Sequence, residues 1–246
     1  MRKPFAVLTV ASLLLVWVGI ARSDDESDAR AIVTKAIKAT GGEAAIAKHK
    51  SATFKEKGLY FGMGGDGLPY TASYAVELPS KFRMDVEGLF LMIVNGDKGW
   101  TKMGDQTKEM TKEELAAQQM TLKAEWMGGL LPLQDKAFTL ATLPEIKIDD
   151  KAAVGVKATR KDYPDLKLYF DKNTNLLVRL EFRTKDAQEN FKDVTMEANY
   201  SNFKEFDGMK IPTKMVIKKD GKRFVEADVL EYKAVEKIDP KMFDRP

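Results

Sequence analysis

The stretch LKLYFDKNTNLLVRLEF, residues 166–182, is typical of two strands joined by a polar, Asx-rich turn. Apolar residues occupy every second position before the turn and again after it, so the predicted hairpin is apolar on one face and polar on the other. Such a face has to be covered, either by another layer of the protein or by a ligand. The apolar residues are Leu166, Leu168, Phe170, Leu176, Val178, Leu180 and Phe182.

Similar alternation elsewhere predicts about ten strands at short, even spacing. Because tight turns join neighbouring strands, we expect an antiparallel meander, mainly β in an α+β chain, with strong curvature. The segment 89–94, LFLMIV, is apolar at every position, which indicates a strand covered on both faces. The other predicted strands are 54–61, 72–78, 82–86, 145–148, 152–159, 194–203, 214–218 and 224–232.

Helical patterns occur at the start of the chain and once in its centre. Residues 24–40 place apolar side chains at helical spacing before Gly41 and Gly42, and residues 43–50 predict a further short helix.

The central helix begins with a capping box, Thr111 and Glu114, and ends at Gly128–Gly129. It carries an apolar stripe that includes Leu122 and Trp126, and the apolar stretch GGLLPL follows it. This segment predicts a helical lid over the oily face of the sheet.

The first 23 residues have the three parts of a secretory signal: a basic start, an uncharged apolar run over 5–20, and small residues. The run is shorter than the roughly 20 residues that cross a bilayer, so cleavage is expected after Ser23 or after Ala21. We therefore expect a mature single domain over 24–246, located in the periplasm of a Gram-negative cell.

Charge and cysteine content exclude several classes of protein. The chain has a formal charge of +3, but residues 1–23 hold three basic and no acidic residues, so the mature part is neutral and nucleic acid is not an expected partner. There is no cysteine, which removes disulfides and a lipid-modified N-terminus.

No motif indicates catalysis, a metal or a cofactor. The single histidine, His49, lies between two lysines and is expected at the surface near a helix end. The sequence GMGGDG at 62–67 precedes a predicted strand, whereas a dinucleotide loop precedes a helix. The DKNTN turn lacks the glycine and the glutamate of a calcium loop. The protein is therefore expected not to be an enzyme.

Three segments carry a resemblance to a known family: LYFDKNTNLLVRLEF, YSNFKEFDGMKIPTKMVI and IDPKMFDRP. With the signal and the first helix they resemble the LolA-like group, the periplasmic outer-membrane lipoprotein-sorting proteins. The resemblance covers most of the mature chain and is strongest over 166–246. It implies an unclosed β-barrel around a hydrophobic cavity, capped by helices, that holds the acyl chains of lipoproteins. It also implies a polar residue that latches the lid, which no position of this sequence matches; Arg83 and Arg179 are candidates, but both lie on the face predicted to be wet, which favours surface roles.

A carrier of this kind needs an enclosed apolar surface, and the chain's 12 methionines suit irregular apolar ligands. A shift of one residue in strand register would exchange Leu91 for Met92. From alternation and lid placement we predict that the cavity and lid are lined by Leu89, Leu91, Ile93, Trp100, Leu122, Trp126, Leu168, Phe170, Val178 and Leu180.

The sequence thus favours a monomeric periplasmic carrier of lipoprotein acyl chains or other lipid, with transport components of the inner and outer membranes as partners. The alternative is a non-enzymatic regulatory or scaffold protein of the envelope, which binds another protein and uses a filled barrel as its framework.

Overall fold

The computed structural model describes residues 20–246, with side chains from Asp24 onward. Most of the predicted export signal, residues 1–19, lies outside the described residues, and both predicted cleavage positions fall in the first turn of the first helix. The helices are α1 (Ile20–Thr40), α2 (Glu43–Lys48) and α3 (Lys112–Gly128), with short 3-10 turns η1 (Leu131–Gln134), η2 (Ala187–Glu189) and η3 (Pro240–Phe243). The strands are β1 (Ser51–Tyr60), β2 (Leu68–Glu77), β3 (Lys81–Val86), β4 (Phe90–Asn95), β5 (Lys98–Met103), β6 (Gln106–Glu109), β7 (Thr139–Ile148), β8 (Lys151–Thr159), β9 (Leu166–Asp171), β10 (Leu177–Asp186), β11 (Lys192–Phe206), β12 (Met209–Lys219) and β13 (Lys222–Val235).

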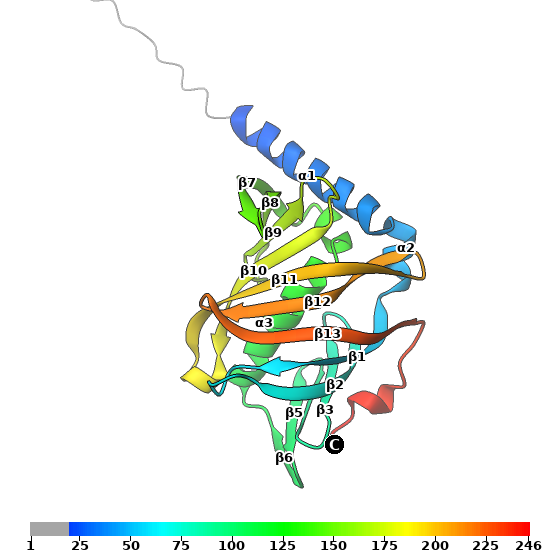
Figure 1. Ribbon diagram of the computed structural model, residues 1–246, viewed down its shortest axis with the longest axis vertical. Coiled ribbons are helices and arrows are strands. Elements are labelled where there is room, and N and C mark those ends of the chain that lie inside the picture. The colour runs from blue at the N-terminus through cyan, green and yellow to red at the C-terminus, as the bar shows by residue number, and fades with distance from the viewer. Residues whose placement is uncertain (1–19) are drawn as a thin grey trace, which may run out of the picture.

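All thirteen strands belong to one antiparallel sheet, which does not close. The order is β6-β5-β4-β3-β2-β1-β13-β12-β11-β10-β9-β8-β7, so each strand pairs with its sequence neighbour, except that β1 pairs with β13 and the link from β6 to β7 leaves the sheet. The sheet curves around α3, which lies behind the central strands in Figure 1, and α1 lies beside β7. The predicted curved, unclosed meander with an N-terminal and a central helix is confirmed.

The hairpin that decides the fold forms β9 and β10. Its turn is closed by Asp171, whose Oδ1 accepts hydrogen bonds from the backbone N–H groups of Asn173 at 3.0 Å and Thr174 at 2.7 Å. An acceptor two and three residues before its donors is an Asx turn, so no ion is required to hold this loop. The predicted turn is confirmed.

We call the face of the sheet that carries Glu56, Phe82 and Leu180 the concave face, because α3 packs against it. Its half nearest α1 is densely packed: β7 to β10 and the last turns of α3 share one core with α1 and η1. The fully buried side chains there include Phe138, Leu166, Leu168 and Phe170.

The opposite, convex face is covered in two places. At β3 to β5, Ile93 and Trp100 pack against Phe243 of η3 and Ile238 of the C-terminal segment. At the other end, Tyr169 and neighbouring apolar side chains form a smaller cluster. The apolar strand β4 is therefore covered on both faces, by α3 on one side and by the C-terminal segment on the other, as the sequence predicts.

Among the described residues, no helix has the length and apolar character needed to cross a bilayer.

Candidate functional site

Helix α3 divides the concave face, and its two parts make different contacts. Its capping box is confirmed: Oγ1 of Thr111 accepts from the N–H of Glu114 at 3.2 Å, and a carboxylate oxygen of Glu114 accepts from the N–H of Thr111 at 2.7 Å. The first three turns, residues 112–122, which we call the N-terminal part of α3, pack on β3 to β5 through Leu115 and Leu122, against Phe82, Val94 and several methionines.

The C-terminal part of α3 is embedded in the packed core. Ala124 and Met127 are fully buried there, and the ring of Trp126 lies 6.3 Å from that of Phe138. A Cβ on Gly128 would stand 2.7 Å from Leu180 Cδ1, so a larger residue here would require the Leu180 side chain to shift. The two parts of α3 therefore differ in how firmly they are held.

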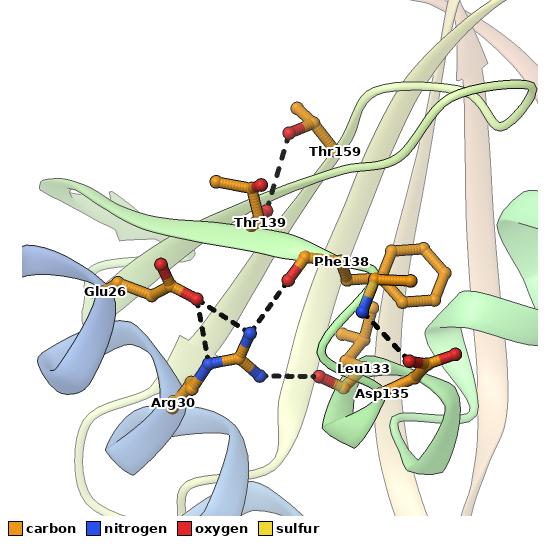
Figure 2. Close-up of polar contacts among 8 residues, drawn as sticks. Glu26, Arg30, Leu133, Asp135, Phe138, Thr139 and Thr159 are labelled. Atoms are coloured by element: carbon orange, nitrogen blue, oxygen red, sulfur yellow. Dashed lines mark hydrogen bonds and ion pairs between the residues drawn. The ribbon is translucent and has the colours of Figure 1, made fainter.

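A polar junction ties α1 to the segment that follows α3 (Figure 2). The Arg30 guanidinium donates to the carbonyl oxygens of Phe138 at 2.8 Å and Leu133 at 3.4 Å. Glu26 Oε1 accepts from the same guanidinium at 2.7 and 3.0 Å, which holds Arg30 in place. The two arginines considered from sequence lie on the convex face: Arg83 pairs with Asp85, and Arg179 pairs with Glu197.

The middle of the concave face, over β1, β2 and β11 to β13, is less completely covered. Strand register places Tyr200, Met215 and Ala227 in one row across it, and Ala198, Ile217 and Val225 in the next. Most of these side chains are only half-buried, although they face inward beneath α3. Apolar surface therefore remains in contact with solvent on the inner side of the sheet.

An acidic cluster lies on this part of the face. Glu56 of β1 is 2% exposed, and its Oε1 accepts hydrogen bonds at 2.7 Å from both the Tyr70 and the Tyr74 hydroxyl of β2. Burial raises the pKa of Glu56, and the two tyrosine hydrogen bonds oppose that rise. Tyr70 and Tyr74 also have raised pKa values, first through burial and then through the charge of Glu56.

Glu125 of α3 completes the acidic cluster. Its side chain is exposed to solvent, yet desolvation raises its pKa to about 7, with the negative charge of Glu56 as the second cause. Burial and the charge of Glu125 raise the pKa of Tyr200 on β11 as well. The charge coupling of Glu125 to Glu56 and Tyr200 places its carboxyl group between α3 and the central strands.

The residues predicted to line the cavity fall on both faces. Leu122, Trp126, Leu168, Phe170 and Leu180 are on the concave side, and the last three are in the packed core.

Leu91, Ile93 and Trp100 lie on the convex face beside η3, so the lining predicted for β4 is wrong by one residue and Met92 faces inward instead. Val178 is also convex, because the pairing of β10 with β9 shifts between Leu177 and Arg179 and reverses the alternation.

Leu89 is 60% exposed in the turn before β4 and borders an open depression of about 570 Å³. That depression lies on the convex side of β1 and β2, with Leu59, Pro69 and three charged residues in its wall. His49 is not a plain surface residue: its ring stacks on Tyr232, with Nδ1 3.2 Å from the hydroxyl oxygen, and burial lowers its pKa.

Within residues 20–246, no group of three or more His, Asp or Glu side chains is placed to hold a metal ion.

Three solved structures share this fold at low sequence identity. A LolA superfamily protein of Nitrosomonas europaea matches 88% of this chain and 97% of its own, with a TM-score of 0.56 and 12% identity. A putative outer membrane lipoprotein-sorting protein domain of Vibrio parahaemolyticus matches 89% of this chain and 97% of its own, with a TM-score of 0.52 and 10% identity. A DUF1329 family protein of Desulfovibrio piger matches 88% of this chain and 97% of its own, with a TM-score of 0.53 and 11% identity.

The strands thus form an open, antiparallel half-barrel that curves around helix α3. The chain has the fold of the LolA superfamily. No family model matches its sequence, and no curated protein matches it either.

Proposed function

We propose that this protein is a periplasmic carrier that holds a lipoprotein acyl chain or another lipid on its concave face. The observation that carries the proposal is the set of half-buried apolar side chains that face inward beneath α3. The LolA fold and the predicted export signal support the same assignment.

The packed half of the concave face is not where the hydrocarbon lies. Leu168 and Phe170 have no exposed surface, so a ligand there would have to displace the core. We assign the ligand instead to the middle of the face and to the space beneath the N-terminal part of α3. The proposed lining is Met84, Met92, Met196, Met215 and Ile217.

The energies are compatible with a lid. Lifting residues 112–122 of α3 exposes Leu122 and Leu115, at about 2 kcal/mol for each leucine, and breaks the hydrogen bonds that Gln119 donates to Gly96 and that Thr184 donates to Ala117. An acyl chain gains about 0.8 kcal/mol per buried CH₂, on the order of ten kcal/mol for a whole chain. The hydrocarbon can therefore offset the lifting of α3, while the buried C-terminal part and the Arg30 junction keep the helix attached.

A carrier also has to receive and release its cargo. Transport components of the inner and outer membranes are the partners we propose, and the protein acts as a monomer between them. Release requires only that α3 returns to the closed position as a partner takes the hydrocarbon. No catalytic step is needed for this cycle.

The test is lipid capture by the mature protein, purified from the envelope of its native host. We expect lipid to co-purify and to be found by native mass spectrometry, and we expect an apolar fluorescent probe to gain signal on binding. Met215→Glu places a charge on the proposed lining and should abolish both signals. Lys214→Glu, an exposed change one residue away, should leave them intact. Absence of co-purified lipid together with no probe signal in the unmutated protein would contradict the carrier proposal.

The convex depression favours a second candidate, the regulatory or scaffold protein. Leu89 is exposed at its border, next to charged side chains, as expected where a protein partner docks. Under this alternative Met215→Glu leaves partner binding unchanged, whereas Leu89→Arg weakens it. Capture of envelope proteins by cross-linking, with both variants in parallel, separates the two functions.

A further inference from the structure

The acidic cluster is unusual for a surface that holds only hydrocarbon. Two carboxyl groups, Glu56 and Glu125, face the same space between α3 and the sheet, among apolar and aromatic side chains. A carboxylate in such surroundings loses hydration. Keeping it charged then costs free energy, unless a cation lies beside it. No lysine or arginine is among the groups that alter the pKa of either carboxyl.

The free atoms of the cluster point to an absent partner. Both tyrosine hydroxyls donate to Oε1 of Glu56, whereas its Oε2 accepts no hydrogen bond from residues 20–246 and is in contact with solvent, since His49 Nε2 is the only buried side-chain nitrogen or oxygen atom without a partner in that range. In the same part of the chain the Glu125 carboxylate receives no hydrogen bond that lowers its pKa. The acceptors left available can bind a group rich in N–H donors.

Aromatic rings surround the same position. Tyr70 and Tyr74 hold their hydroxyls on Glu56, and the Phe54 ring stacks on that of Tyr74 with 4.4 Å between centroids. Strand register places Phe54, Glu56 and both tyrosines on the concave face. Aromatic faces next to carboxylates attract organic cations, and ammonium groups in particular.

We propose that the concave face selects amphiphiles whose polar end carries an ammonium group, with Glu56 and Glu125 as its counter-ions. This inference rests on the proposed carrier function and names the ligand class. The alkyl chain lies under the N-terminal part of α3, and the ammonium lies between β1 and the C-terminal part, which the packed core holds in place.

The inference also sets a pH dependence. The titratable groups that face Glu125 are Glu56, Tyr74 and Tyr200, and the raised pKa of about 7 leaves Glu125 largely protonated at pH 6. A cation binds the ionised form, so affinity for an ammonium ligand should rise between pH 6 and pH 8. Affinity for an uncharged ligand should not rise over this range.

The experiment compares three probes that differ only in their polar end: decylamine, decanol and decanoate. Binding is measured by calorimetry at pH 8, below the concentrations at which the probes aggregate. We expect decylamine to bind about 10- to 100-fold more tightly than decanol, as is typical of charge-assisted hydrogen bonds, and decanoate to bind most weakly.

Glu125→Gln should remove most of the preference for decylamine over decanol. Glu113→Gln, an exposed change in the first turn of the same helix, should leave the preference for decylamine unchanged. Glu56→Gln should have the same effect as Glu125→Gln. If the Glu56 variant does not fold, the Glu125 variant and the pH series still test the inference.

Equal affinities for decylamine and decanol, unchanged in Glu125→Gln, would overturn the inference while leaving the carrier function in place. Failure of all three probes to bind would overturn the carrier function, and the inference with it.

Discussion

Leu122 provides the sharpest test of α3 as a lid, because it joins the third turn of the helix to β3 and β4. Its side chain is 3% exposed and packs against Phe82 and Val94. Leu122→Ala removes this contact and leaves a cavity, which costs about 3 kcal/mol of folding free energy.

The same substitution should strengthen ligand binding. If the hydrocarbon binds only when the N-terminal part of α3 lifts, the contact that Leu122 makes in the closed form opposes binding. Removing about 3 kcal/mol from the closed form can raise the apparent affinity by up to about 100-fold. A loss of stability combined with a gain of affinity is the signature of a contact that has to break.

The assay is a titration with an apolar fluorescent probe, alongside chemical unfolding of each variant. Leu140→Ala is the matched control, since Leu140 is 1% exposed and lies in the packed half next to α1. This control should lose a similar free energy of unfolding and gain no affinity. Wild-type affinity in a destabilised Leu122→Ala, or an equal gain in both variants, would refute the assignment of a moving N-terminal part.

Three further predictions concern stability. Because the folded pKa of Glu125 is raised to about 7, the folded state binds a proton more readily than the unfolded state, so the free energy of unfolding should fall as pH rises from about 4.5 to 7. Glu125→Gln should flatten this dependence in denaturant titrations at several pH values, and an unchanged slope would count against the assignment. Arg30→Ala removes charge-assisted hydrogen bonds to two carbonyls and should lower the free energy of unfolding by about 2 kcal/mol, or Tm by about 4–8 °C. The exposed control Lys35→Ala should change Tm little in the same thermal melts. Phe243→Ala should lower the free energy of unfolding by about 3–5 kcal/mol in denaturant titrations, because the ring is fully buried against β3 and β4. Met242→Ala next to it should be near neutral, and equal effects of the two changes would contradict the covered convex face.

The elements of the fold follow from local patterns in the sequence. The turn at Asp171 and the capping box at Thr111 and Glu114 are short-range features, each set by side chains within a few residues. The double cover of β4 is also predictable, because a strand that is apolar at every position has no face for solvent.

The face assignments depend on facts that alternation does not contain. In β4 both faces are apolar, so the pattern cannot say whether Leu91 or Met92 faces α3. In β10 the irregular pairing after Leu177 reverses the alternation, and Val178 moves to the convex side. Both errors are register errors of one residue, which is the least determined quantity in a strand.

The acidic cluster was missed for a different reason. Glu56 occurs in a strand with lysines on either side and reads as a solvated carboxylate, and only the pairing of β1 with β2 places it between Tyr70 and Tyr74. Glu125 did give a signal: it stands three residues after Leu122 and next to Trp126, within the apolar stripe of the central helix. An acid inside an apolar stripe is a candidate for a buried functional group.

Stability and binding use different parts of this sheet. The half near α1 supplies side chains without exposed surface, so it can maintain the fold while the middle of the concave face stays incompletely filled. Helix α3 belongs to both parts, through Met127 at its buried end and through Leu122 near its methionine-rich partners. Moving only residues 112–122 breaks these apolar contacts and two hydrogen bonds, those of Gln119 to Gly96 and of Thr184 to Ala117, far fewer interactions than global unfolding breaks. A ligand of modest size can therefore open the site, and a folded core remains to close it again.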